Sequence, residues 1–113
     1  MAVKERTITL TDRAPIRIVE DDWPVLASAK WWEGENEFQS ERTALLRVRR
    51  SGDGRHIVYG ATDWVGNSGR RAGVLLDAFG SSMLCATIRE VAQAIGYPDL
   101  ANECIANLPP ERL

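Results

Sequence analysis

The sequence predicts an α+β fold in which an antiparallel three- to four-stranded meander carries helices packed on one face and ends in a C-terminal helical pair. Three observations predict it. A strong β-hairpin pattern lies at 45–64, β-branched extended segments precede it at 6–11 and 16–19, and apolar residues at helical spacing follow it. At 113 residues the chain is long enough to build one hydrophobic core. We therefore expect a single α+β domain spanning 1–113.

Residues 22–29 are predicted to form a helix that runs into a strand through Trp31 and Trp32. Asp22 can cap this helix, and Pro24 suits its first turn. Apolar residues then recur at helical spacing: Val25, Leu26, Ala29 and Trp32. A strand is the alternative, because apolar residues also alternate over the same stretch: Val25, Ala27, Ala29 and Trp31.

The central hairpin is predicted to turn at SGDG, residues 51–54, because a tight turn needs the backbone freedom of glycine. If Arg50 pairs with Arg55, each core-type pair falls on one face: Val48 with Ile57, Leu46 with Tyr59, and Ala44 with Ala61. These side chains are then expected to be buried together. The opposite face turns three polar side chains to solvent or to a partner: Arg47, Arg49 and His56. A bulge in the turn would shift this register by one residue.

The next stretch predicts a loop, a strand and a helix. Residues 65–73 are rich in glycine and typical of a loop, and AGVLLD at 72–77 is typical of a strand buried on both faces. Ser81 or Ser82 is expected to cap the helix that follows, and Gly96 to end it. The apolar stripe of this helix has five members: Leu84, Ile88, Val91, Ala92 and Ile95.

A last short helix is predicted to begin at a cap formed by Asp99. Its apolar residues are Leu100, Cys104, Ile105 and Leu108. The two cysteines, Cys85 and Cys104, lie in apolar helical patterns, where free cysteine behaves as a small buried hydrophobe. A disulfide is not expected in a cytosolic chain that has a core.

Charge is segregated along the chain, although the formal net charge is only −2. Residues 20–41 hold seven acids against Lys30, and residues 42–71 hold seven arginines against Asp53 and Asp63. The two segments either form an interaction surface or neutralise each other in the fold. Because the sequence has neither the apolar stretch of a signal peptide nor a run long enough to span a membrane, we expect a cytoplasmic protein with no membrane partner.

No set of residues predicts catalysis, a cofactor or a metal site, and we expect a protein that is not an enzyme. His56 could be oriented by Asp53 or Asp63, but no serine has the setting of an activated nucleophile. The glycine-rich loop lacks a phosphate-binding lysine and precedes a strand instead of a helix. The single histidine leaves too few ligands for a zinc site.

The arginines of the hairpin predict a partner-binding surface. In the predicted register they share a face with a histidine and a tryptophan, and two more arginines precede the third strand. The predicted partner-binding residues are Arg47, Arg49, His56, Trp64, Arg70 and Arg71. The alternative is the solvated face of an ordinary antiparallel sheet.

An exposed tryptophan among arginines is typical of a protein interface. We therefore predict a non-enzymatic protein-interaction module with a protein partner, such as an accessory or inhibitor protein, and a homodimer is one form it could take. The alternative is a nucleic-acid-binding protein that uses the arginine face to contact phosphates. The overall acidic charge disfavours this alternative, because it repels nucleic acid at long range.

Three stretches resemble those of small uncharacterised bacterial proteins carried on plasmids and other mobile elements. They are TITLTDRAPIRIVEDDWPVLASA, GDGRHIVYG and CIANLPPERL, which lie in the first, middle and last parts of the chain. The resemblance implies no catalytic or binding residue. It implies an accessory protein of a mobile element, a class in which regulators and inhibitors often act by binding.

The helix stripe leads to a prediction about stability. Ile88 lies in the middle of the stripe, so Ile88→Ala is expected to lower the free energy of unfolding by about 2–5 kcal/mol, because the change leaves a cavity in the core. Urea unfolding measures the loss. A value below about 1 kcal/mol would mean that a different face of the helix packs into the core.

Overall fold

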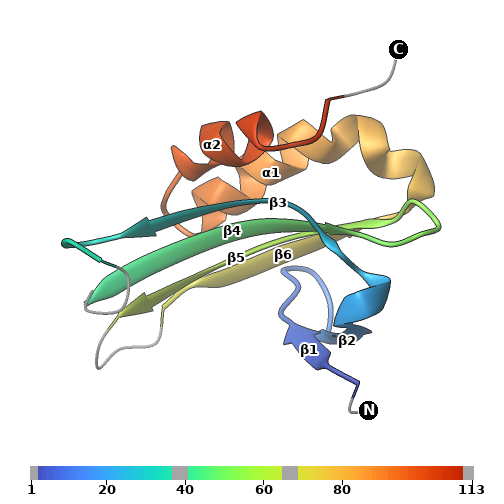
Figure 1. Ribbon diagram of the computed structural model, residues 1–113, viewed down its shortest axis with the longest axis horizontal. Coiled ribbons are helices and arrows are strands. Elements are labelled where there is room, and N and C mark those ends of the chain that lie inside the picture. The colour runs from blue at the N-terminus through green and yellow to red at the C-terminus, as the bar shows by residue number, and fades with distance from the viewer. Residues whose placement is uncertain (1–2, 37–40, 65–68, 111–113) are drawn as a thin grey trace.

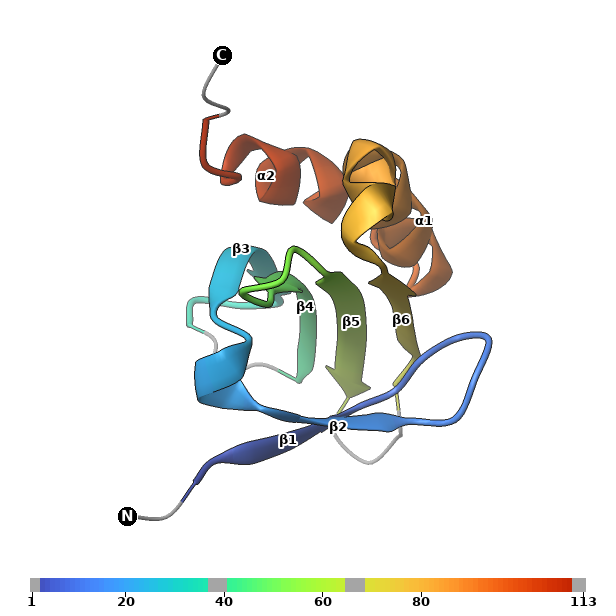
Figure 2. The same ribbon diagram turned by 90° about the vertical axis from the view of Figure 1, so that its right-hand side faces the viewer.

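The computed structural model describes residues 3–36, 41–64 and 69–110 and has the predicted α+β fold. The elements in chain order are β1 (Glu5–Ile8), β2 (Ile16–Val19), the 3-10 turn η1 (Glu20–Asp22), β3 (Val25–Trp32), β4 (Arg42–Arg50), β5 (His56–Trp64), β6 (Arg71–Leu76), the 3-10 helix η3 (Ala78–Met83), α1 (Leu84–Ala94) and α2 (Leu100–Ala106). An antiparallel four-stranded sheet of order β3-β4-β5-β6 forms the middle layer (Figure 1). The helices cover one face, and the β1-β2 hairpin lies against the other (Figure 2).

The helix predicted at 22–29 is wrong, because strand β3 occupies most of this stretch. Only η1 turns helically, and β3 pairs with β4 along its length. Ala27 and Ala29 are buried against the helices, as the alternative strand pattern indicated. The register shifts between Val25 and Ala27, and this irregularity breaks the alternation that identifies a strand in sequence.

The central hairpin is present, but its register differs by one residue from the predicted register. Arg50 pairs with His56 instead of Arg55. As a result, Tyr59 lies directly opposite Arg47, on the same face of the sheet. The predicted grouping of core pairs is therefore wrong, since every β5 side chain faces the side opposite to the predicted one.

The turn of the hairpin explains this shift. Ser51 N–H donates to the carbonyl oxygen of Arg55 at 2.9 Å, and Gly54 has a φ of 90°. A turn that ends in a left-handed glycine is the usual form of a three-residue hairpin loop, and its odd length moves β5 by one position. Hydrogen bonds from the Ser51 hydroxyl and from Arg55 hold the pKa of Asp53, at the tip, down to about 2.

The helices cover one face of the sheet, as predicted, and the β1-β2 hairpin, which the sequence did not place, covers part of the other face. On the helix side, Leu46, Val48 and Val58 pack with the buried stripe of α1. On the other side, Ile57 and Tyr59 pack with residues of the N-terminal segment: Ile8, Leu10, Ile18 and Trp23. A strand covered on both faces does not show a clean polar and apolar alternation, and β5 is of this kind.

The C-terminal helical pair is confirmed. The stripe of α1 is buried at Ile88, Val91 and Ala92, Ile95 is buried just beyond the helix, and Leu84 is half-buried. Gly96 ends the helix with a φ of 86°, and the amides of Gly96 and Tyr97 donate to carbonyl groups of the last turn. In the part of the chain that the structure describes, no helix is long and apolar enough to cross a membrane.

The caps predicted for both helices are wrong. The chain enters α1 through η3, so neither Ser81 nor Ser82 caps it. The Asp77 carboxylate instead accepts a hydrogen bond from Phe79 N–H at 2.9 Å and caps η3. Asp99 has a helical backbone conformation and makes no side-chain cap for α2.

The N-terminal segment also closes part of the outer edge of β6. Thr11 N–H donates to the carbonyl oxygen of Gly73 at 2.8 Å, and Gly73 N–H donates to the hydroxyl of Thr11 at 3.1 Å. A Cβ atom at Gly73 would lie 2.4 Å from the carbonyl oxygen of Thr9. Glycine is therefore required where the N-terminal segment crosses this strand.

Arg49 is the buried link between the sheet and the N-terminal segment. Its side-chain Nε donates to Tyr59 Oη at 2.9 Å, and Nη1 donates to the carbonyl oxygen of Trp23 at 3.0 Å. The Glu20 carboxylate lies 3.9 Å from Nη2. The prediction that Arg49 faces solvent is therefore wrong, because residues 20–23 fold over this part of the face.

Replacing Arg49 tests this link. Arg49→Leu is expected to lower the free energy of unfolding by about 2–4 kcal/mol, because Tyr59 Oη and the Trp23 carbonyl lose their donor while they stay buried. The matched control is Arg17→Leu, whose side chain is 70% exposed and ion-paired to Glu5 at 3.7 Å. Urea unfolding should show a change of about 0.5 kcal/mol or less for the control. Equal losses would contradict the assigned role of Arg49.

Candidate functional site: the open face of the sheet

The residues predicted to bind a partner do not share one face. Arg47, Arg49 and Arg71 point to the side of the β1-β2 hairpin, whereas His56 and Trp64 point to the helix side. Arg49 and His56 are only 5% and 4% exposed, so the expectation that both face solvent is wrong. The single arginine row of the predicted register is therefore divided between two surfaces.

Trp64 belongs to an aromatic group at one end of the sheet. The Arg42 guanidinium lies over its ring at 4.9 Å, and Arg70 lines a hollow beside it. The rings of Trp31 and Tyr97 lie 5.1 Å apart on the same side. These contacts account for the partial exposure of Trp31 and Trp64, at 38% and 40%, as rings packed at the margin of the helix layer.

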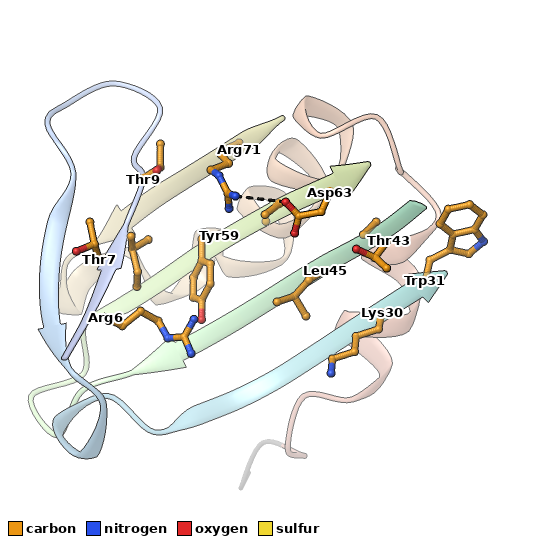
Figure 3. A pocket seen from close by; sticks show the side chains of 15 residues that line it. Arg6, Thr7, Thr9, Lys30, Trp31, Thr43, Leu45, Tyr59, Asp63 and Arg71 are labelled. Carbon is orange, nitrogen blue, oxygen red and sulfur yellow. Dashed lines mark hydrogen bonds and ion pairs between the residues drawn. The ribbon is translucent and has the colours of Figure 1, made fainter. Parts of the chain in front are cut away.

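The hairpin covers only part of the opposite face. It packs over Ile57 and Tyr59, and beyond them a hollow of about 340 Å³ lies between β1 and the main sheet. We call the uncovered region the open face, and six side chains from its four strands define it: Lys30, Thr43, Leu45, Ala61, Asp63 and Arg71. Figure 3 shows Leu45 and Tyr59 on its floor, with Arg6, Thr7 and Thr9 of the N-terminal segment along one wall.

Positive charge predominates around this hollow. Among the described residues, its lining includes Arg6, Lys30 and Arg71, and Asp63 is the carboxylate. Arg71 Nη2 lies 3.3 Å from Asp63, and Arg6 Nε lies 2.8 Å from Glu20, which is outside the hollow. The hydrogen bond from Arg6 is the main cause that lowers the pKa of Glu20. Each of these two guanidinium groups still has further N–H donors, with which it could bind an additional negative group.

Arg47 extends the cationic side of this face. It lies between Ser28 on β3 and Tyr59 on β5. Its Nε is buried and has no hydrogen-bond partner among the described residues. Buried polar atoms without a partner are uncommon in native proteins, so this guanidinium retains the capacity to bind a further acceptor.

Sequence reasoning found Arg47 and Arg71 but missed the wall formed by Arg6, Thr7 and Thr9. These residues come from the N-terminal segment, which is remote in the sequence from β4 and β5. Their alternation indicated a strand, and no local signal showed that this strand would lie across the face of the central sheet.

The segregated charges are partly neutralised within the fold. Glu20 lies 3.9 Å from Arg49, and Glu33 lies 3.8 Å from Arg42, so acids of the first segment pair with arginines of the second. These pairs support the interpretation that the two charged segments neutralise each other in the fold. Of the arginines of the second segment, Arg71 lines the hollow and Arg47 lies on the same side of the sheet.

Other chemistry in the described ranges is limited. Cys85 and Cys104 are free thiols, and burial raises the pKa of the Cys104 thiol to about 11. Within residues 3–36, 41–64 and 69–110, histidine, cysteine and carboxylate side chains form no group of three or more that could hold a metal ion.

Comparisons of the chain with protein-family models, curated proteins and solved structures found no match.

The buried imidazole of His56 gives the fold a pH dependence. Burial, and then the positive charge of Arg50, lower its pKa below the ordinary value of 6.5, against the opposing effect of a backbone hydrogen bond with Gly54. The folded protein therefore keeps His56 neutral near neutral pH. In the unfolded chain the same side chain titrates near its ordinary value.

We expect the free energy of unfolding to fall as the pH drops below about 6.5, because the unfolded chain takes up a proton that the folded protein excludes. The slope from this one group is at most about 1.4 kcal/mol per pH unit, and His56→Gln should remove it. The free energy of unfolding is measured in urea between about pH 7.5 and pH 5, a range in which most carboxylates stay ionised. Parallel slopes for the two proteins would assign the dependence to other groups.

Proposed function

We propose that the chain is a non-enzymatic protein-interaction module whose open face receives an extended, acidic segment of a partner protein. The observation that carries the proposal is that one half of a sheet face is packed while the other half forms a cationic hollow. An accessory or inhibitor protein of a mobile element, as the sequence resemblance implies, would act through binding of this kind.

The backbone of β1 supports an extended ligand. Within the described part of the chain β1 pairs with β2 alone, and residues 6–9 line the hollow. A segment lying beside them can form main-chain hydrogen bonds with this strand edge, as in other complexes formed by strand addition. Its side chains would then rest on Leu45 and Ala61, on the floor of the open face.

The charge of the lining supports an acidic ligand. Arg71 and Lys30 lie on opposite sides of the floor, on β6 and β3, so carboxylates of a crossing segment would meet a cation at either side. Arginine binds carboxylates through paired N–H donors, which adds direction to the attraction. Asp63 already accepts a hydrogen bond from Nη2 of Arg71, and a ligand carboxylate would accept hydrogen bonds from the other N–H groups of this guanidinium.

The division of the arginines favours a protein partner over nucleic acid. A phosphate backbone is bound by several cations on one surface, whereas this fold places Arg47 and Arg71 on one side and Arg42 and Arg70 on the other. Arg49 is buried and holds the fold together. The nucleic-acid alternative therefore has fewer arginines on one face than the predicted row supplied.

The binding experiment uses a synthetic peptide of about eight residues that alternates glutamate and valine, titrated into isotope-labelled protein and followed by NMR. Backbone amide shifts are expected at Leu45, Ala61 and Thr9, and none on α1. A peptide in which lysine replaces glutamate should not bind. Arg71→Glu is expected to weaken binding about tenfold or more, because like charges oppose each other.

Two variants separate the open face from general electrostatics. Arg89→Glu makes the same charge change on the exposed surface of α1 and should leave the affinity unchanged. Ala61→Phe fills the floor without changing the charge and should block binding. Shifts that map to the helices, or equal effects of the two charge reversals, would refute the proposal.

A nucleic-acid titration provides the competing outcome. Duplex DNA at physiological salt is expected to bind no tighter than the micromolar range of non-specific binders, about 10⁻⁶ M. Binding that is tight, weakens steeply with salt and disappears in Arg47→Glu would replace the protein-interaction proposal with the nucleic-acid alternative.

A further inference from the structure

A second cavity lies on the helix side, at the end of the sheet opposite Trp31 and Trp64. It has a volume of about 540 Å³, and its lining comes from the start of the helical layer, the C-terminal segment and the strand ends near the β4–β5 turn. Small-molecule sites in proteins have volumes of about 300–1,000 Å³ and are concave, mostly apolar and lined by few polar groups. The cavity has this size.

One part of the lining is apolar. It comes from three separate regions of the chain: Leu26 on β3, Leu84 at the start of α1, and Leu108, Pro109 and Pro110 after α2. Leu26, Leu84 and Leu108 are only half-buried, so each still presents apolar surface that a ligand could cover. Covering such surface stabilises a complex in proportion to its area.

The other part of the lining is polar and carries positive charge. Arg50, Ser81 and Ser82 line the cavity, and no carboxylate is among the described residues of its lining. Among the described residues, the Arg50 guanidinium has no ion pair or hydrogen bond. Other arginines of the described residues, such as Arg42 and Arg55, are ion-paired, so their charge is already partly compensated.

His56 provides an independent indication of a ligand. It lines the same cavity, is 96% buried (4% exposed), and its Nδ1 is buried with no hydrogen-bond partner in the described part of the chain. Most buried polar atoms in proteins have a partner, and an orphan is explained by a bound water, an ion or a function. Arg50 is the cross-strand neighbour of His56, so the orphan and the unpaired cation lie together.

We infer that this cavity binds a small amphipathic organic anion, with its apolar body against Leu26, Leu84 and Leu108 and its anionic group on Arg50, Ser81 and Ser82. A guanidinium and two hydroxyls supply donors for a carboxylate or a phosphate, and both anions share this chemistry. The site is separate from the open face, so it can be occupied whether or not that face binds a partner.

Cys85 is a built-in reporter of occupancy. It lines the cavity and is half-buried, whereas Cys104 is fully buried. Alkylation by iodoacetamide, followed by peptide mass spectrometry, therefore measures access to the cavity at one position. The probes are octanoate and octanol, which have the same number of carbons and differ in charge.

Saturating octanoate is expected to slow the alkylation of Cys85 about tenfold or more. In Arg50→Gln the octanoate concentration that gives half-protection should rise about tenfold, because the charge-assisted hydrogen bonds are lost. Arg89→Gln removes a charge from the exposed face of α1 and should leave the half-protection concentration unchanged. Octanol should protect only as weakly as octanoate protects Arg50→Gln.

Three results would overturn the inference. They are no protection by octanoate, equal protection of the wild type and Arg50→Gln, or equal protection by octanol and octanoate. The last two would show an apolar cavity without an anion site. Inorganic phosphate distinguishes the two anion classes: if it displaces octanoate at low concentration, the anionic subsite favours phosphate, and if it does not, the subsite favours a carboxylate.

Discussion

The buried guanidinium of Arg49 is the interaction on which the arrangement of this protein depends. It joins β4 to Tyr59 on β5 and to the main chain of Trp23, and thereby fixes the segment that leads from the N-terminal hairpin into β3. A buried cation is stable only when its donors are satisfied, so its partners must occupy these positions whenever the protein is folded. The N-terminal segment is consequently a fixed layer of the structure.

That layer is too short to cover the sheet. β1 and β2 have four residues each, whereas β4 and β5 have nine, so the hairpin protects one part of the face and leaves the open face beside it. The covered half holds the large apolar side chains Ile57 and Tyr59, and apart from Leu45 the open half holds smaller or polar ones such as Thr43, Ala61 and Asp63.

The sequence predicted the secondary-structure elements better than it predicted the strand register and the packing of the elements against one another. The C-terminal helices and the hairpin follow from local periodicity and turn residues, and these were correct. The burial of Arg49 could not be predicted, because its partners Glu20 and Trp23 lie outside the local pattern. The register depended on a loop of three residues at 52–54, which differs from a loop of four only in the hydrogen bond between Ser51 and Arg55. The open face depended on the register and on the burial of Arg49. Of the predicted binding residues, Arg47, Arg49 and Arg71 lie on its side of the sheet, and Arg49 is buried there beneath the N-terminal segment.

The register also explains how one strand can serve two surfaces. Along β4, side chains alternate between the faces, so Arg47 and Arg49 lie toward the N-terminal hairpin and Arg50 lies toward the helices. With the three-residue loop, Tyr59 faces Arg49 and His56 faces the helix side with Arg50. A loop one residue longer or shorter would reverse β5, and it would separate each of these pairs at once. The turn therefore determines both the link that holds the N-terminal layer and the polar group that lines the second cavity.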